Sequence, residues 1–478
     1  MTIDAETPLH AGGLHAVRIA QRVEVNRAVQ ELADQLPDTL HDGSKSLTKD
    51  DVEAVRRAIL NISPPSADNY QTHAHTQLAA KMGRRIASAL GMDETAQNVA
   101  EVLLLAHDGG RFLTHRGLRN DLLLQKIVKA LNVRPDLLEG APDILLDPKK
   151  SAEAIFEGMS SMQRVVVAAD LCGKRRYKDW DILTYDQVLE YHAMSRKKAE
   201  NASRTDRSGT FPSERRVDVP MIEKAGKLYV LLRNWLADDG ILVDDLRADV
   251  LEEERQSGVK HIIFDVGDVL IPNPDPQIIR ALSTTLSLDE AVVETALIET
   301  AKPWQLGRIS DDEFWNNFER KLDKSLSDDQ RKALMLTGLR DINIDQEMET
   351  LLGELKGQGY KLHVLTDTVP PHLRYLGEQR NLFGQFETVM SSTAFHANKS
   401  GDFAAQSEKG LVEGENPTVA YACALTTLGA APKSCIFIDD KPVNLEKAKG
   451  LGIRTIPYRY NQGVASLRQA LTTQGIGV

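Results

Sequence analysis

The chain has 478 residues, of which 42% are hydrophobic and 27% are charged, and its formal net charge is −11 at pH 7. This size predicts roughly three domains with a substantial core, and the acidic balance argues against nucleic acid or an anionic membrane as the main partner. The three cysteines show neither disulfide nor metal-ligand spacing, the N-terminus has no apolar core of signal-peptide type, and no stretch approaches the ~20 apolar residues of a membrane span. We therefore expect a cytoplasmic protein without membrane contact that acts on a small molecule; a homo-oligomer is left open.

The first ~255 residues have a helical pattern almost throughout. Apolar residues recur at spacings of three and four, as in VAEVLLLAHD (99–108) and MIEKAGKLYVLLRNWL (221–236). A polar segment with glycine and proline, residues 201–218, predicts a loop. We expect a helical extension over residues 1–65, an all-α domain over 66–240 and a linker over 241–259.

Three places in the expected all-α domain carry residues that suit a metal ion. His75 lies on the apolar face of a predicted helix, where a buried imidazole needs a polar partner. His73 is the alternative candidate for this ligand. The adjacent pair His107 and Asp108 ends an apolar helix, and Asp170 ends the run VVVAAD. Imidazole and carboxylate both bind divalent transition metals, so the adjacent pair can direct two ligands at one ion.

These segments resemble the HD superfamily of metal-dependent phosphohydrolases. HTQLAAKMGRRIASALG (75–91) is similar to its first motif, LLLAHDGGRFLTHRG (103–117) to its second and VVVAADLCGKR (165–175) to its last. The resemblance implies an ion such as Mn²⁺, Fe²⁺, Co²⁺ or Ni²⁺, whose bound water would attack phosphorus. It implies four metal ligands, namely His75, His107, Asp108 and Asp170. A domain of this fold that binds no metal is the alternative.

Basic residues follow two of these motifs. Arg111, His115 and Arg116 come directly after the His-Asp pair, and Lys174 follows the last motif. Guanidinium groups match phosphate oxygens, and a histidine can act as an acid or as a further metal ligand. We therefore expect these four residues to bind an anionic substrate such as a nucleotide or another phosphate ester. The alternative is that they are ordinary surface residues.

The pattern changes at Lys260. Short runs rich in β-formers alternate with helical stretches, which predicts a parallel sheet with crossover helices. The five runs are HIIFDV (261–266), KLHVLTD (361–367), FETVMSS (386–392), SCIFIDD (434–440) and RTIPY (454–458). We expect an α/β Rossmann-like domain over 260–478, with a helical cap over about 274–345 between the first two strands.

Polar residues stand at the ends of these predicted strands. They are Asp265, Thr366 and the pair Asp439–Asp440. Lysines lie in the sequence between Thr366 and Asp439. A parallel sheet brings such ends to one edge. Phosphoryl transfer needs a nucleophile, donors for the transferred oxygens and charge neutralisation. A carboxylate can be that nucleophile, and other carboxylates can hold a hard divalent cation.

The segments FDVGDVL (264–270), LTDT (365–368) and IFIDDKPVN (436–444) resemble three motifs of the haloacid dehalogenase (HAD) superfamily, and QLGRISDDEFW (305–315) is similar to its helical cap. The resemblance implies Asp265 as nucleophile, Thr366 as phosphate donor and Lys399 as catalytic lysine, with Lys409 as the alternative. It implies Mg²⁺ as cofactor. The implied magnesium ligands are Asp265, the carbonyl of Gly267, Asp439 and Asp440, with Asn444 orienting their loop.

Gly267 departs from the usual phosphatase pattern, which has an acid at this place to protonate the leaving group. Loss of a general acid typically slows a reaction by about 10²–10⁴-fold. Asp268 should not replace it, because neighbouring residues at a strand end point differently. We therefore expect a phosphatase restricted to good leaving groups such as sugar 1-phosphates. A dehalogenase acting on a small halo-acid is one alternative, and an inactive scaffold is another.

Together the two halves predict a bifunctional hydrolase of phosphate esters, with nucleotides or sugar phosphates as the expected substrates. One centre would use a transition metal and the other an aspartate nucleophile with Mg²⁺. The alternative is that one half is catalytic while the other is a nucleotide-sensing or scaffold module.

Overall fold

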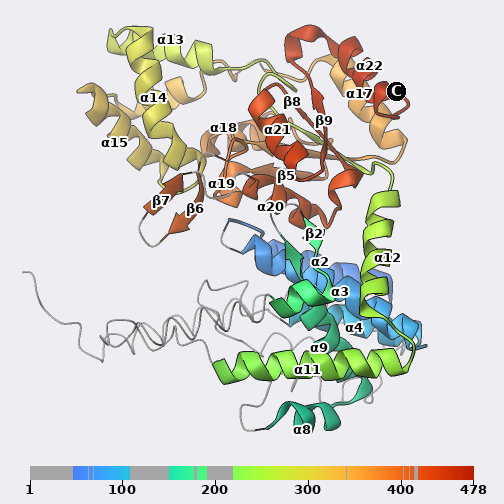
Figure 1. Cartoon of the computed structure of the whole chain (residues 1–478). Coiled ribbons are helices and arrows are strands. Elements are labelled where there is room, and N and C mark those ends of the chain that lie inside the picture. The colour runs from blue at the N-terminus through green and yellow to red at the C-terminus, as the bar shows by residue number, and fades with distance from the viewer. Residues whose placement is uncertain are drawn as a thin grey trace, which may run out of the picture. The chain divides into compact units, whose positions relative to one another are not determined.

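The computed structural model (Figure 1) describes most of the chain after the first 46 residues. The described residues are 47–62, 64–67, 69–107, 150–176, 180–190, 219–340, 342–401, 403–407, 410–413 and 418–478. They form two compact units. The first ends at Leu251, and the second comprises Glu252–Val478 together with short pieces of the first half such as Pro65–Tyr70.

Helices dominate the first unit. They are α2 (Lys49–Ile62), α3 (Tyr70–Ala89), α4 (Glu94–Ala106), α8 (Ala152–Glu157), α9 (Ser161–Cys172), α11 (Val219–Asp238) and α12 (Val243–Gln256). The expected all-α character is not complete, because β1 (Arg175–Arg176) and β2 (Asp181–Ile182) pair with each other. The segment expected as a linker, 241–259, is mostly the helix α12, which buries Val243, Arg247 and Val250.

The core of the first unit is built around α3, α4 and α9. Nearly every residue of α4 from Val99 onward is buried, as expected for a helix that is apolar all round. Asp93 begins this helix by accepting a hydrogen bond from the Ala96 amide, and Ser160 and Gln163 form a capping box at the start of α9. Helix α2 contributes to the same core through residues such as Val55. The expected extension therefore supplies a helix to this unit.

A five-stranded parallel sheet forms the centre of the second unit, and it confirms the predicted parallel α/β arrangement. Its strand order is β5-β4-β3-β8-β9. The strands are β3 (His261–Phe264), β4 (Lys361–Thr366), β5 (Thr388–Ser391), β8 (Cys435–Asp439) and β9 (Arg454–Pro457). The chain passes from β3 outward to β5 and then returns to the other side of β3. Ligands bind at such a topological switch point, outside the carboxyl ends of the strands.

The two faces of the sheet are covered by different helices. Ile262 and Phe264 of β3 point into the core shared with α17 (Gln346–Gly357) and α22 (Val464–Thr473). On the opposite face Tyr421 packs edge-to-face on Phe437. The remaining helices around the sheet are α18 (Pro370–Arg374), α19 (Ser392–Phe395), α20 (Val419–Leu428) and α21 (Pro442–Gly450). Short 3-10 or π-helical turns lie at Tyr375–Gln379, Pro432–Ser434 and Tyr460–Gln462.

Four helices occupy the segment that was expected as a cap. They are α13 (Asp275–Leu286), α14 (Glu290–Gln305), α15 (Asp311–Leu322) and α16 (Asp328–Met335), and Figure 1 shows α13 to α15 as a group in yellow. Their aromatic core includes Trp304 and Phe314, whose rings stack with centroids 4.0 Å apart. A two-stranded antiparallel pair, β6 (Phe403–Ser407) and β7 (Gly410–Glu413), precedes α20. Among the described residues, no helix has both the length and the apolar character needed to cross a bilayer.

Candidate functional sites

The first candidate site lies at the carboxyl edge of the parallel sheet. Phe264 is in register with Ile438 on β8 and with Val364 on β4, so the residues that follow them meet at this edge. Asp265 is the first residue after β3, and Asp439 is the last of β8. Because the three central strands are buried, their register cannot shift without moving buried side chains to the other face of the sheet. Asp265 and Asp439 are therefore held close together.

Lys399 joins these two carboxylates. Its Nζ lies 2.6 Å from Asp265 Oδ1 and 2.8 Å from Asp439 Oδ2, and the side chain is only 2% exposed. The Lys399 amide donates to the carboxylate of Asp367, at 3.1 and 3.2 Å. Burial alone would lower the pKa of Lys399, but the carboxylates of Asp265, Asp439 and Asp367 raise it, so the ammonium stays charged. The alternative, Lys409, lies outside the described residues.

Asp265 is buried in this cluster. Burial raises its pKa to about 7, with the Asp439 carboxylate acting in the same direction and the Lys399 ammonium opposing it. The Val266 amide also donates to Asp265 Oδ1, over 2.7 Å. A divalent cation beside Asp265 would favour its ionised form, which is the form that can act as a nucleophile.

Three carboxylates at this edge suit a hard cation. Oxygens of Asp265, Asp439 and Asp440 all lie within 4.8 Å of one another. Asp440 Oδ1 is buried and has no hydrogen-bond partner among the described residues, which is an unfavourable state unless an ion or water is bound. Asn444 donates from Nδ2 to both oxygens of Asp439, at 3.0 and 3.1 Å, and so holds that carboxylate. This oxygen-rich set fits Mg²⁺.

Thr366 and Gly267 line the same cavity as Asp265. Thr366 Oγ1 accepts a hydrogen bond from the Thr368 amide, which leaves its hydroxyl hydrogen available as a donor. A Cβ added at Gly267 would meet no atom within 4 Å. Asp268 has φ 58°, and its Oδ1 accepts from the Asn273 amide at 3.3 Å. Asp268 therefore secures its own loop.

The cavity has a volume of about 430 Å³ and extends from these carboxylates to the cap helices. This volume is within the range of about 300–1,000 Å³ that is usual for small-molecule sites. Sequence reasoning assigned no role to Asp367, although it lies within the LTDT segment. A carboxylate directly after the strand-ending Thr366 was a usable signal, and the structure shows that it anchors the backbone of Lys399.

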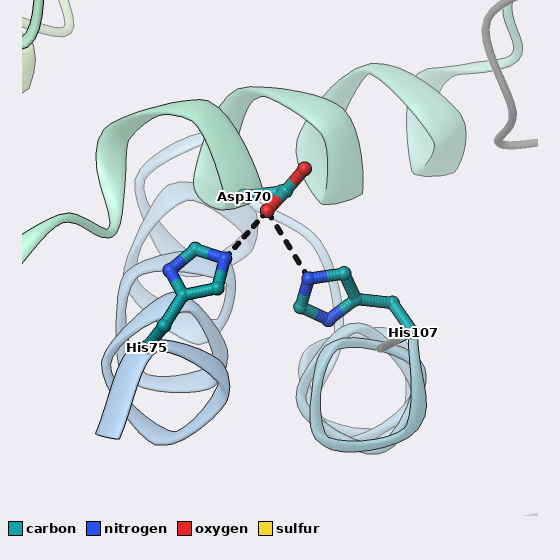
Figure 2. Close-up of side chains that lie close together, drawn as sticks. All are labelled: His75, His107 and Asp170. Carbon is teal, nitrogen blue, oxygen red and sulfur yellow. Dashed lines mark hydrogen bonds and ion pairs between the residues drawn. The ribbon is translucent and has the colours of Figure 1, made fainter. Parts of the chain in front are cut away.

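The second candidate site lies in the first unit, among three helices (Figure 2). His75 on α3, His107 at the end of α4 and Asp170 on α9 point toward one another. Asp170 Oδ1 lies 2.8 Å from His75 Nε2 and 3.1 Å from His107 Nε2. Lys174 Nζ lies 3.2 Å from His75 Nε2. The rival residue His73 is buried but is not a member of this cluster of described residues.

The hydrogen bonds of the two imidazoles favour a metal ion between them. His75 Nδ1 lies 2.7 Å from the carbonyl of Gly173, and His107 Nδ1 lies 2.5 Å from the carbonyl of Leu104. A carbonyl can only accept, so each Nδ1 carries a proton, and in its neutral form each ring presents a bare Nε2 to the Asp170 carboxylate. Burial lowers the pKa of His75, with Lys174 acting in the same direction, which favours this neutral form. A cation would satisfy all three facing lone pairs.

Gly173 is a residue of this site that sequence reasoning did not single out. A Cβ at this position would lie 2.8 Å from the Ala79 Cα and 2.9 Å from the Ala79 nitrogen. Only glycine therefore lets the turn after α9 approach α3 closely enough for its carbonyl to hold His75. The glycine in VVVAADLCGKR was visible in the sequence, but the backbone approach that it permits was not. Asp108, Arg111, His115 and Arg116 lie outside the described residues.

Solved structures of HAD family enzymes align with about 44% of the chain. No family model matches the chain. A sesquiterpene phosphatase of Aspergillus oryzae is 24% identical over 198 residues, which are 41% of this chain and 87% of that protein.

Two of the similar solved structures are the following. A HAD family enzyme of Bacteroides thetaiotaomicron, in complex with magnesium and inorganic phosphate, is 21% identical, covers 44% of this chain and 99% of its own, and has a TM-score of 0.36. An L-2-haloacid dehalogenase of Xanthobacter autotrophicus is 16% identical, covers 42% and 77%, and has a TM-score of 0.31. None of these three proteins is described as an HD-domain protein.

Proposed function

We propose that the second unit is a magnesium-dependent phosphatase that uses Asp265 as its nucleophile. This proposal rests mainly on the buried Lys399 ammonium, which contacts both Asp265 and Asp439 beside a cavity. A structural ion pair would not need to be placed at a cavity, beside a third carboxylate with an unpartnered oxygen. The similarity to a phosphatase supports the same reaction class.

In the proposed reaction, a carboxylate oxygen of Asp265 forms a bond to phosphorus while the ester P–O bond breaks. The leaving oxygen takes a proton from solvent, because Gly267 offers none. Water then hydrolyses the aspartyl-phosphate, which releases inorganic phosphate and restores Asp265. Lys399 and Thr366 would hold the transferred oxygens. Asp265, the Gly267 carbonyl, Asp439 and Asp440 would hold Mg²⁺, which neutralises phosphate charge when it is bound.

Phosphate release from an activated ester such as phenyl phosphate tests this function. We expect Asp265→Asn to reduce kcat by at least about 10³-fold, because the amide is not a nucleophile. Asp289→Asn is the matched control, since Asp289 caps α14 away from the cavity and asparagine caps helices equally well. Hydrolysis that survives in Asp265→Asn would contradict the assignment. Release of halide from a small halo-acid without Mg²⁺ would instead favour a dehalogenase.

We also propose that the first unit holds a transition metal through His75, His107 and Asp170, with Asp108 as a fourth ligand. The convergence of two Nε2 atoms on one carboxylate oxygen supports this assignment. Such an ion would supply an activated water for phosphoester hydrolysis. Lys174, beside His75, together with Arg111, His115 and Arg116, would bind the phosphate, and nucleotides or sugar phosphates are the substrates to test first.

Metal analysis of the purified protein tests this second centre. We expect His75→Ala and Asp170→Asn each to lower the bound Mn, Fe, Co or Ni by at least about tenfold. Asp93→Asn is the control, because it alters a carboxylate in the same unit that caps α4 and is not a member of the metal cluster. Equal metal content in the wild-type protein and in all three variants would contradict the proposal. Bound metal and nucleotide without turnover would favour a sensing or scaffold role for this half.

A further inference from the structure

The wall of the second-unit cavity that faces the carboxylates is apolar. Asp265, Thr366 and Lys399 line one side, where the sheet ends. The other side is formed by the cap helices, mainly α13 and α14 with residues of α15 and α16. Its lining includes Ile278, Ile279, Leu297, Ile298, Ala301 and Trp304. A substrate whose phosphate lies at the carboxylate edge must therefore place the rest of its structure against hydrocarbon side chains.

None of the described cap residues that line the cavity is positively charged. Among the described residues that line the cavity, the two cationic side chains are Lys399 and Lys441, and both belong to the sheet edge. Glu294 and Gln305 are polar lining residues of α14, and the carboxylate of Glu294 would repel a second anionic group. Asn273, Asp275, Thr368 and His372 also line the cavity, but none of them is a cation that could pair with a further phosphate on the leaving group.

Ile298 marks the edge of this apolar wall. It lines the cavity, yet 58% of the residue is exposed to solvent. Val292, on the same helix, is similarly exposed at 48% but does not line the cavity. The apolar lining of the cavity thus continues onto the exposed surface of α14 at Ile298. A long apolar group of the substrate could extend out of the cavity along this surface.

We propose that the substrates of the second unit are phosphate monoesters of an apolar phenol or of an apolar alcohol that is a good leaving group, and that their hydrocarbon group lies against α13 and α14. This inference rests on the phosphatase function proposed above and specifies its leaving group. It departs from the sugar phosphates and nucleotides expected from the sequence, because the cap wall offers these molecules few polar contacts.

A series of 4-alkylphenyl phosphates tests the inference. Lengthening the alkyl chain from methyl to butyl to octyl changes the apolar surface but hardly changes the leaving-group pKa, so the missing acid at Gly267 does not confound the comparison. With Mg²⁺ and the full-length protein, we expect kcat/KM to rise about two- to fourfold for each buried methylene until the cavity is filled. Glucose 1-phosphate and AMP should be at least about tenfold poorer than the octyl ester.

Two surface variants locate the binding wall. Ile298→Asp should lower kcat/KM for the octyl ester by about tenfold and leave phenyl phosphate within about twofold, because a carboxylate would face the alkyl chain. Val292→Asp should leave both values unchanged. The two residues are similarly exposed on one helix, so a general effect of the new charge on folding would appear in both variants.

The outcomes separate this inference from the proposed function. If phenyl phosphate is hydrolysed in an Asp265-dependent way but kcat/KM is flat along the series, the apolar substrate class is wrong and the phosphatase function stands. Better hydrolysis of glucose 1-phosphate or AMP than of the octyl ester leads to the same conclusion. If no ester is hydrolysed, the proposed function fails, and the inference fails with it.

Discussion

In the proposed reaction, Gly267 occupies the position from which a side chain would protonate the leaving group, and the space around it is open. A Cβ built there has no atom within 4 Å, while the neighbouring Asp268 is engaged with the Asn273 amide. The site therefore has space for an acidic side chain at position 267, and glycine simply does not supply one. An acid introduced at position 267 would point into the same cavity as Asp265.

We expect Gly267→Asp to raise kcat/KM for alkyl phosphates, whose leaving groups are poor, by about tenfold or more, since general acid catalysis is worth about 10²–10⁴-fold. Activated aryl esters, which need little protonation, should change by less than about threefold. The measurement is the dependence of kcat/KM on leaving-group pKa. Gly267→Asn adds the same bulk without the proton, and equal behaviour of the two variants would show that the acid has no effect.

Lys399 contributes to stability as well as to the site. It is buried between Asp265 and Asp439, so its removal leaves carboxylates buried without a counter-charge. We expect Lys399→Met to lower the free energy of unfolding by about 3 kcal/mol, and to lower it less when Mg²⁺ is present, because the cation can replace part of the lost charge. Urea unfolding with and without Mg²⁺ measures both effects.

Lys441→Met is the control for this experiment. Lys441 lines the same cavity but its side chain is exposed, so its loss should change stability by no more than about 0.5 kcal/mol. An equal loss of stability in the two variants would mean that burial between carboxylates is not what makes Lys399 important.

At the scale of elements, β3 and β4 carry a pair of histidines at the end of the sheet opposite the candidate site. His261 Nδ1 lies 3.0 Å from His363 Nε2 and the rings stack. Burial lowers the pKa of His363 to about 3, and His261 and Lys361 act in the same direction. Burial likewise lowers the pKa of His261 to about 4, with help from Lys361 and Lys260. Both rings are therefore neutral in the folded protein near pH 7.

This pair predicts acid lability. Each folded-state pKa lies below the unfolded value of about 6.5, so the unfolded chain binds protons first as the pH falls. The contribution of this pair to stability should be constant above about pH 7 and decline between about pH 6.5 and pH 4, by an amount on the order of 2–4 kcal/mol for His363, which is 2% exposed. Unfolding curves across this range should show a shallower decline for His363→Leu. A decline of unchanged slope would exclude the pair as its cause.

The elements also show how far sequence reasoning reaches. The strands of the sheet could be predicted because buried parallel strands are short runs of β-branched and aromatic residues. Lys399 was preferred to Lys409 only through the family resemblance, which places a lysine before the helix that is α20 here, although β6 and β7 separate the two. The apolar wall of the cavity could not be predicted, because a stripe on α14 has the same spacing whether it faces a core or a ligand. The β1–β2 pair was missed since two-residue strands have no periodicity.

At the scale of the whole molecule, each candidate site rests on a core of its own. The core behind the His75 site joins residues from Leu47 to Val250, and the core behind the Asp265 site joins residues from Ile262 to Ile476. A hydrophobic core is a cooperative unit, so changes made in one should not transmit to the other unless a specific contact links them. Independent units are what two separate hydrolytic activities require, whereas a sensing role requires coupling.

A cross-comparison of single variants decides between these two arrangements. We expect Asp170→Asn, which alters the metal cluster of the first unit, to leave kcat/KM for phenyl phosphate within about twofold, and Asp265→Asn to leave the content of transition metal unchanged. The double variant should then lose both properties additively, as uncoupled sites do. A change of more than about fivefold in phosphatase activity on Asp170→Asn would correspond to a coupling free energy of at least about 1 kcal/mol. That result would make the first unit a regulator of the second and would replace the bifunctional reading.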